Sequence, residues 1–200
     1  MRRRTFLAVT AATMAAPPVR AQEIRRVRGT VEKVEGTTLH VKTRDGEDLV
    51  IALAERPVFT AIVPASLSDL KPGTYVGSAA LPGPDGTLQA IEVHIFPEAM
   101  RGAGEGHRSW DGADRATMTN ANVETAVAGV DGRVLTLKYK DGEKKLLVTP
   151  QTAIVAFAPG DRAEVGPGTS IFAIATQQQG GGALQASRIS YGRDGLTPPM

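Results

Sequence analysis

The sequence predicts an all-β protein that consists of two tandem small OB-like β-barrels joined by a Gly-rich linker. The first observation is an internal repeat: residues 31–41 (VEKVEGTTLHV) align with residues 127–137 (VAGVDGRVLTL) at a constant offset of 96 positions. The second is that no stretch after residue 21 shows sustained helical periodicity. The third is a set of Asp-Gly pairs between short apolar runs, a strong hairpin signal because both turn positions need a positive φ. These pairs are Asp45-Gly46, Asp85-Gly86 and Asp141-Gly142.

Residues 1–21 are typical of a signal peptide of the twin-arginine class, with cleavage expected after Ala21. The pair Arg3-Arg4 precedes a mildly apolar run (6–16) and a small-residue site, which is the charged, apolar, small order of a signal peptide. The apolar run is too short to span a bilayer, which takes about 20 residues. An ordinary secretory signal with one extra arginine is the alternative. Both interpretations predict an exported, periplasmic protein.

The charge of the chain belongs mostly to this segment. Without the four arginines of residues 1–21, 19 of the 23 Lys and Arg residues remain against 21 Asp and Glu, a net charge of −2. A weakly acidic mature protein is not expected to bind nucleic acid. The chain contains no cysteine, so disulfides, thiolate metal sites and a cysteine nucleophile are excluded.

Within each repeat, the pattern predicts five or six short strands. The strand at 90–95 alternates with a period of two, which places Ile91, Val93 and Ile95 on one face. A short helical turn is expected at 66–70, with Ser66 as its cap. Closure of so few strands into a barrel removes the exposed edges of an open sheet.

The repeat also sets the predicted domain boundaries. The two copies stay aligned to the end of the repeat, with one residue lost before position 70 and the offset of 96 restored by residues 88–90. The expected organisation is a signal peptide (1–21), a first barrel domain (22–97), a linker (98–121), a second barrel domain (122–191) and a C-terminal tail (192–200).

The first repeat, residues 27–96, resembles the exported β-barrel domains of the DUF5666 type. The motifs that carry the resemblance are R-G-T-V at 28–31, L-S-D-L-K-P-G-T-Y-V at 67–76 and G-T-L-Q-A-I-E-V at 86–93. The second repeat, 122–191, matches more loosely. The resemblance implies an OB-like fold and an envelope location, and it brings no catalytic residues.

The whole chain, including residues 97–102 and 192–200, is also similar to a group of proteobacterial proteins that often carry a metal-transporter permease label. A permease needs spanning segments of about 20 apolar residues. The mature part contains no such stretch, so we expect no transmembrane segment and no permease activity.

The linker holds the residues that the repeat does not explain. One interpretation is a flexible connector, in which Trp110, the chain's single tryptophan, packs between the domains. The other is a binding loop that presents Met100 and Trp110 to a partner. Glu105, His107 and Asp111 are the candidate metal ligands, although they lack the fixed spacing of structural zinc sites. His40 and His94 alternate with apolar residues and are predicted to be solvated.

The leading functional prediction is a periplasmic binding or interaction module for a protein or small ligand of the cell envelope. Aromatic residues make up 4% of the chain, which disfavours glycan and single-stranded nucleic acid because both need stacking platforms. No G-x-S-x-G, H-E-x-x-H or P-loop motif is present, so no enzyme is predicted. The alternative is a periplasmic metal-ion binding protein that uses the linker and the histidines. A metal ion is then the only cofactor expected, and a small hydrolase is a third reading.

Overall fold

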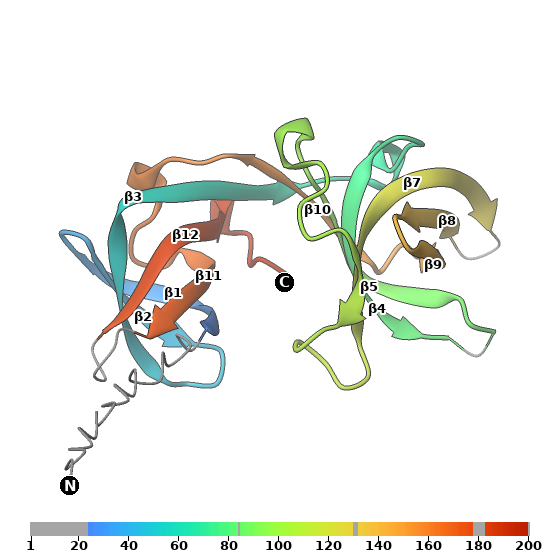
Figure 1. Ribbon diagram of the computed structural model, residues 1–200. Helices are drawn as coiled ribbons and strands as arrows, with labels where there is room; N and C mark the ends of the chain where they lie inside the picture. Colours follow the sequence, from blue (N-terminus) through green and yellow to red (C-terminus); the bar gives the residue numbers. More distant parts are fainter. Residues whose placement is uncertain (1–23, 84, 130–131, 178–182, 200) are drawn as a thin grey trace, which may run out of the picture.

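The computed structural model describes residues 24–83, 85–129, 132–177 and 183–199, and the predicted signal peptide (1–21) lies outside them. Twelve strands in these residues form one hydrogen-bonded sheet (Figure 1). They are β1 (Ile24–Glu35), β2 (Thr38–Thr43), β3 (Asp48–Pro64), β4 (Tyr75–Pro82), β5 (Leu88–Ile95), β6 (Gly106–Ser109), β7 (Thr117–Gly129), β8 (Gly132–Tyr139), β9 (Gly142–Val148), β10 (Ala153–Pro159), β11 (Ser170–Gln177) and β12 (Leu184–Gly192).

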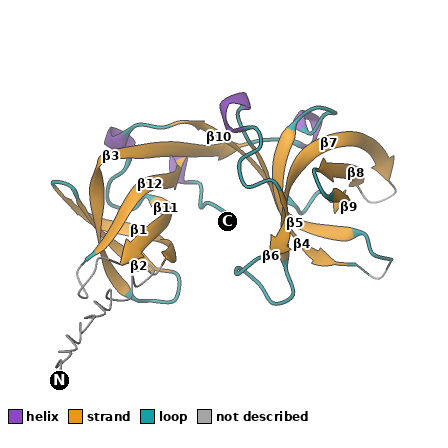
Figure 2. Cartoon of the chain, in the orientation of Figure 1, coloured by secondary structure: helices purple, strands orange, loops and turns teal. Residues whose placement is uncertain are grey.

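The helical elements are short. The described residues contain four 3-10 turns of three residues each, shown in purple in Figure 2: η1 (Leu67–Asp69), η2 (Glu98–Met100), η3 (Arg162–Glu164) and η4 (Arg193–Gly195). None of the helices among these residues has the length and apolar character that crossing a membrane requires. The all-β prediction is confirmed, and the helical turn expected at 66–70 is η1.

The sheet closes into a barrel at each end. In barrel 1, β1 pairs with β2 and β11, β2 pairs with β3, and β12 closes the circuit by pairing with β11 and, in parallel, with β3. In barrel 2, β7 pairs with β8 and β4, β8 pairs with β9, and β5 closes the circuit by pairing with β4 and, in parallel, with β9. Both are the small five-stranded barrels that the sequence predicts.

The two repeats, however, exchange strands. Barrel 1 combines β1, β2 and β3 of the first repeat with β11 and β12 of the second, and barrel 2 combines β7, β8 and β9 with β4 and β5. The predicted domains, 22–97 and 122–191, therefore do not correspond to the barrels. Each domain boundary was drawn along the chain, whereas each barrel is assembled from both halves of it.

The exchange passes through a two-stranded bridge. The second half of β3 pairs antiparallel with β10, with Ala61 opposite Ala158 and Ile62 opposite Phe157. Under the offset of 96 residues, Ala61 corresponds to Phe157 and Ile62 to Ala158, so each pair is the repeat equivalent of the other. An approximate two-fold axis therefore passes between the two pairs. Figure 1 shows β3 and β10 spanning the space between the barrels.

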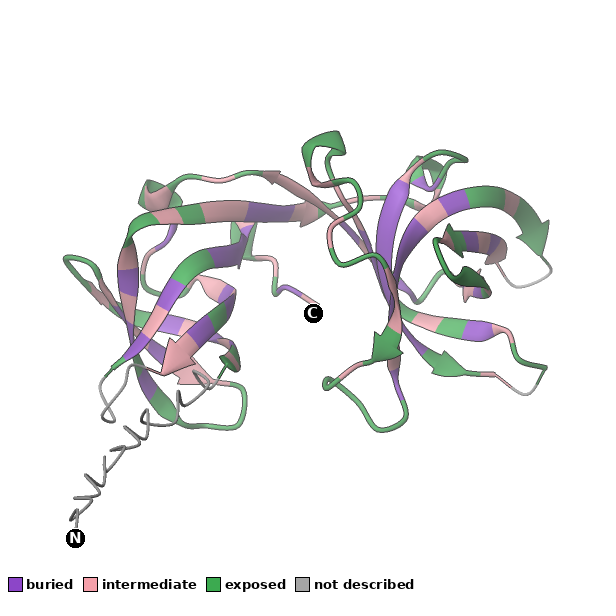
Figure 3. Ribbon diagram, viewed as in Figure 1, coloured by how far each residue is buried: buried purple, intermediate pink, exposed green. Residues whose placement is uncertain are grey.

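Each barrel has its own apolar core, and Figure 3 shows the buried residues alternating along the strands. The core of barrel 1 draws on both repeats, with Leu39 and Ile51 packed among Ile171, Ala173 and Ile189. The core of barrel 2 is equally mixed. A smaller cluster around Ile62 and Val155 fills the bridge. The outward faces of the strands are then free to form the surface between the barrels.

Candidate functional site

A cavity of about 400 Å³ lies between the two barrels, beneath the bridge. Barrel 1 contributes outward residues of β1, β11 and β12, and barrel 2 contributes residues of β5 and β7. Thr60 of β3 and Phe157 of β10 come from the bridge, and the linker supplies the remaining side. We call this cavity the groove. Because its walls come from both barrels and from the linker, the strand exchange itself creates it.

The barrel 1 side of the groove is basic. Arg26 and Arg28 lie two residues apart on β1 and therefore point to the same face, opposite to the buried Val27. Arg188 of β12 lines the same side, and Arg108 of β6 lines the groove from the linker. Asp111 is the single acidic residue among its described lining residues. A cavity with four guanidinium groups and one carboxylate favours an anion.

Arg28 is the most enclosed of these arginines. Its side chain is 18% exposed, and its guanidinium carbon lies 5.2 Å from the ring centre of Phe172 and 5.9 Å from that of Trp110. Its terminal nitrogen donates a hydrogen bond of 2.9 Å to Asp111. Its Nε atom is buried and has no hydrogen-bond partner. Arg28 therefore retains an unused donor next to two aromatic rings.

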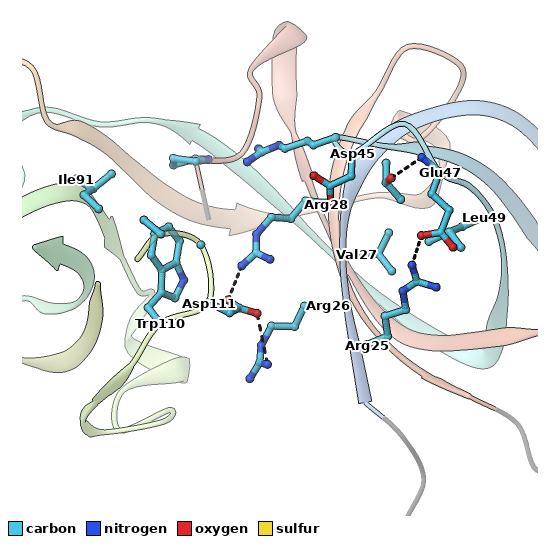
Figure 4. Close-up of a pocket in the computed structure, with 15 residues that line it drawn as sticks. Arg25, Arg26, Val27, Arg28, Asp45, Glu47, Leu49, Ile91, Trp110 and Asp111 are labelled. Atoms are coloured by element: carbon cyan, nitrogen blue, oxygen red, sulfur yellow. Dashed lines mark hydrogen bonds and ion pairs between the residues drawn. The ribbon is translucent and has the colours of Figure 1, made fainter. Parts of the chain in front are cut away.

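A second cavity, of about 420 Å³, adjoins the groove (Figure 4). The two cavities share Arg26, Arg28, Trp110 and Asp111, which we call the arginine junction. In the second cavity Arg25 is paired with Glu47, so that positive charge is already matched. At the junction two arginines share the one carboxylate of Asp111.

The opposite side of the groove is aromatic and apolar. Phe96 and Phe157 lie 5.2 Å apart between ring centres, and His94 meets both edge-on at 4.9 and 5.3 Å. Met100 and Met118 extend the apolar lining. Apolar walls with a few placed polar groups are typical of small-molecule sites.

His94 and its neighbours form a buried polar cluster behind this aromatic wall. His94 is 5% exposed, and its Nδ1 atom lies 3.7 Å from the carboxylate of the fully buried Glu92. Its ring packs over Gly77 so closely that a Cβ there would overlap it. The prediction that His94 is solvated is therefore wrong. Strand alternation does turn His94 away from the barrel interior, but the bridge and the segment after β5 cover that outer face.

The predicted linker residues divide into two groups. Met100, Trp110 and Asp111 line the groove together. Glu105 instead accepts a hydrogen bond of 2.9 Å from the backbone of Lys140, and His107 shares one of 2.8 Å with Thr119. Burial lowers the pKa of His107, and the charge of Lys144 lowers it further.

The proposed metal ligands consequently have separate partners, since Asp111 faces the arginines while Glu105 and His107 lie along β6 and its surroundings. Within the described part of the chain, no cluster of three or more His, Asp or Glu side chains could hold a metal ion. The linker is also more regular than a flexible connector, because β6 pairs with β7.

Sequence reasoning missed the arginines and the phenylalanines of the groove. A signal was present in the run R-R-V-R at 25–28, the densest basic cluster after the signal peptide. The aromatic partners come from β10 and β11, which lie far from this run in the sequence. Without the strand exchange, nothing brings them to the same cavity.

Comparisons with protein-family models, with curated proteins and with solved structures find no match for this chain.

Proposed function

We propose that this protein is an exported binding module that holds a small anionic ligand with an apolar body in the groove. The observation that carries the proposal is the lining of the groove, where Arg28 and three further arginines, with a single carboxylate, face an apolar wall. Hydrogen bonds from a charged donor to an anion are about twice as strong as neutral ones. The arginines would hold the anionic group, and the aromatic wall would hold the apolar body.

The location in the cell envelope is part of the proposal. It is supported by the charged, apolar, small order of residues 1–21 and by the resemblance of the repeats to DUF5666-type domains. A binding role agrees with the architecture, because two barrels joined by two bridge strands form a scaffold around a shared cavity. The linker contributes through Met100 and Trp110, the residues that the sequence singled out for interaction.

The test is a ligand screen on the mature protein, using carboxylates, phosphates and sulfonates with apolar groups of increasing size. Binding is measured by calorimetry, and Arg28→Met keeps the apolar stem while it removes the charge. Because hydrogen bonds to charged groups contribute about 1.5–3 kcal/mol, we expect roughly a 10- to 100-fold loss of affinity.

The matched control is Lys138→Met, which removes one positive charge from the outer surface of barrel 2, where Lys138 pairs with Glu124. This variant is expected to bind as the wild type does. Affinity of the wild type should also fall as salt is added. Equal losses in both variants, or no binding of any anion in the panel, would refute the proposal.

A further inference from the structure

We propose that Trp110 and Asp111 occupy the ligand site in the resting protein, and that the groove accordingly takes an aryl-substituted carboxylate, in which a short chain separates a planar carboxylate from an aromatic ring. The inference rests on the proposed function and narrows it to one ligand class and one mode of regulation. In the resting structure the linker occupies the anion site, and the ligand must displace it.

The first support is the geometry of the Asp111 carboxylate. One of its oxygens accepts a hydrogen bond of 2.9 Å from Arg28, and the other lies 3.6 Å from a guanidinium nitrogen of Arg26 (Figure 4). The carboxylate therefore bridges two guanidinium groups, with one oxygen directed to each. A ligand carboxylate of the same planar shape could take over both contacts, since guanidinium groups match carboxylates in this way.

The second support is the position of the adjacent ring. Trp110 precedes Asp111 and places its indole near Arg28, in the same cavity as Phe172. An aromatic ring beside a carboxylate is thus already accommodated next to the arginines. A ligand with these two groups would reproduce both interactions, and the methionines and phenylalanines of the groove would hold the rest of it.

The third support is that the segment around Asp111 is weakly held. Asp111 is 45% exposed, and residues 112–115 are all exposed. The turn is closed mainly by its own backbone, through hydrogen bonds from Trp110 to Ala116 and from Ala116 to Ala113. Arg115 within it adopts a positive φ of 56°, which is uncommon for a residue other than glycine. The pair that Asp111 forms with Arg26 is exposed on both sides, at 45% and 54%, and exposed ion pairs are worth little, so a ligand can compete with Asp111 there.

Asp111 can act on the groove in two ways, as a clamp that shapes it or as a competitor of the ligand. If Asp111 were a clamp that shapes the groove, its removal would weaken ligand binding. If Asp111 is a competitor, its removal strengthens binding, because the arginines are then free in the resting protein. The two roles predict opposite signs for one substitution.

The experiment measures phenylacetate and its uncharged analogue phenylacetamide on the mature wild type, on Asp111→Asn and on Asp114→Asn. Asp114 is the matched control, since it lies three residues further on in the same turn, is 97% exposed on its side chain and does not line the groove. Calorimetry gives the affinity. The emission of Trp110 reports the linker directly, because it is the chain's single tryptophan.

We expect Asp111→Asn to bind phenylacetate about fivefold more tightly than the wild type, as the loss of a weak competing ion pair allows. Asp114→Asn should bind phenylacetate with the affinity of the wild type. None of the three proteins should bind phenylacetamide. Phenylacetate should also shift the Trp110 emission of the wild type to the red, as the indole moves into water.

Unchanged or weaker binding of phenylacetate by Asp111→Asn would overturn the inference. So would binding of phosphates or aliphatic acids by the wild type without binding of phenylacetate, an outcome that leaves the proposed function intact. If neither the wild type nor Arg28→Met binds any anion of the panel, the proposed function is refuted as well.

Discussion

At the scale of single residues, the buried pair Glu92 and His94 is the most unusual feature of the chain. Both carboxylate oxygens of Glu92 and the Nδ1 atom of His94 are buried, and none of them has a hydrogen-bond partner. Buried polar groups without partners are costly, and their closest compensation is each other, at 3.7 Å. The repeat places Arg188 and Ser190 at the equivalent positions of barrel 1. The polar pair is therefore specific to the barrel 2 side of the groove.

We expect the two residues to be energetically coupled. His94→Phe leaves the buried Glu92 carboxyl without its closest polar neighbour, and a buried polar group without a partner costs about 1–3 kcal/mol. The double variant Glu92→Leu/His94→Phe removes both polar groups among Phe96 and Phe157, so it should recover most of that loss. Urea unfolding of the single and double variants measures the coupling. Additive effects would show that the two side chains act independently.

The residues of the site also show where sequence reasoning reaches its limit. Met100 and Trp110 were predicted to interact because they lie outside the repeat, and both line the groove. The burial of His94 could not be predicted, since alternation along β5 reports only which side of the strand a residue takes. What covers that side is decided by β10, which lies about 60 residues further along the chain.

At the scale of elements, turns and strands were predictable and pairing was not. Gly46 and Gly86 adopt positive φ values of 85° and 81°, as their Asp-Gly pairs predicted, but Asp45 and Asp85 do not, so the expectation of a positive φ at both turn positions is wrong. In contrast, the pairing of the strands could not be predicted. A barrel that closes within one repeat and a barrel that takes strands from both repeats contain the same kinds of strand in the same order. Local patterns are identical in the two arrangements, so the sequence favours neither. The difference lies in β3, which bends but continues without a break through 17 residues from barrel 1 into the bridge (Figure 1).

The bridge is therefore the element on which the arrangement depends. Ile62 of β3 is fully buried there and packs with Val155, Phe157 and Phe172. We expect Ile62→Ala to lower the free energy of unfolding by about 2–5 kcal/mol, the range for a buried aliphatic side chain. Val58 is the control, because it lies on the same strand but is 52% exposed, and Val58→Ala should change stability by less than about 0.5 kcal/mol. Denaturant unfolding measures the free energy of unfolding of both variants. Equal losses in Ile62→Ala and Val58→Ala would show that the bridge has no apolar core of its own.

At the scale of the whole molecule, the exchange makes two barrels into one folding unit with a shared cavity. The core of barrel 1 needs Ile171 and Ile189 from the second repeat, just as the core of barrel 2 needs Val76 and Val93 from the first. Neither repeat can bury its apolar face by itself in this arrangement. The strand exchange holds the barrels together without the linker, which leaves the linker free to act at the groove.

A cut in the linker tests this directly. A protease site inserted between Asp114 and Arg115, in the exposed turn, divides the chain between the repeats. Because each barrel contains strands from both fragments, we expect the cut protein to elute at the position of the intact protein and to separate only in denaturant. The uncut protein with the same insertion is the control for the turn itself. If each repeat closed its own barrel, the cut would instead release two folded halves that elute separately without denaturant. The groove would then also lose its ligand, because its walls come from both barrels.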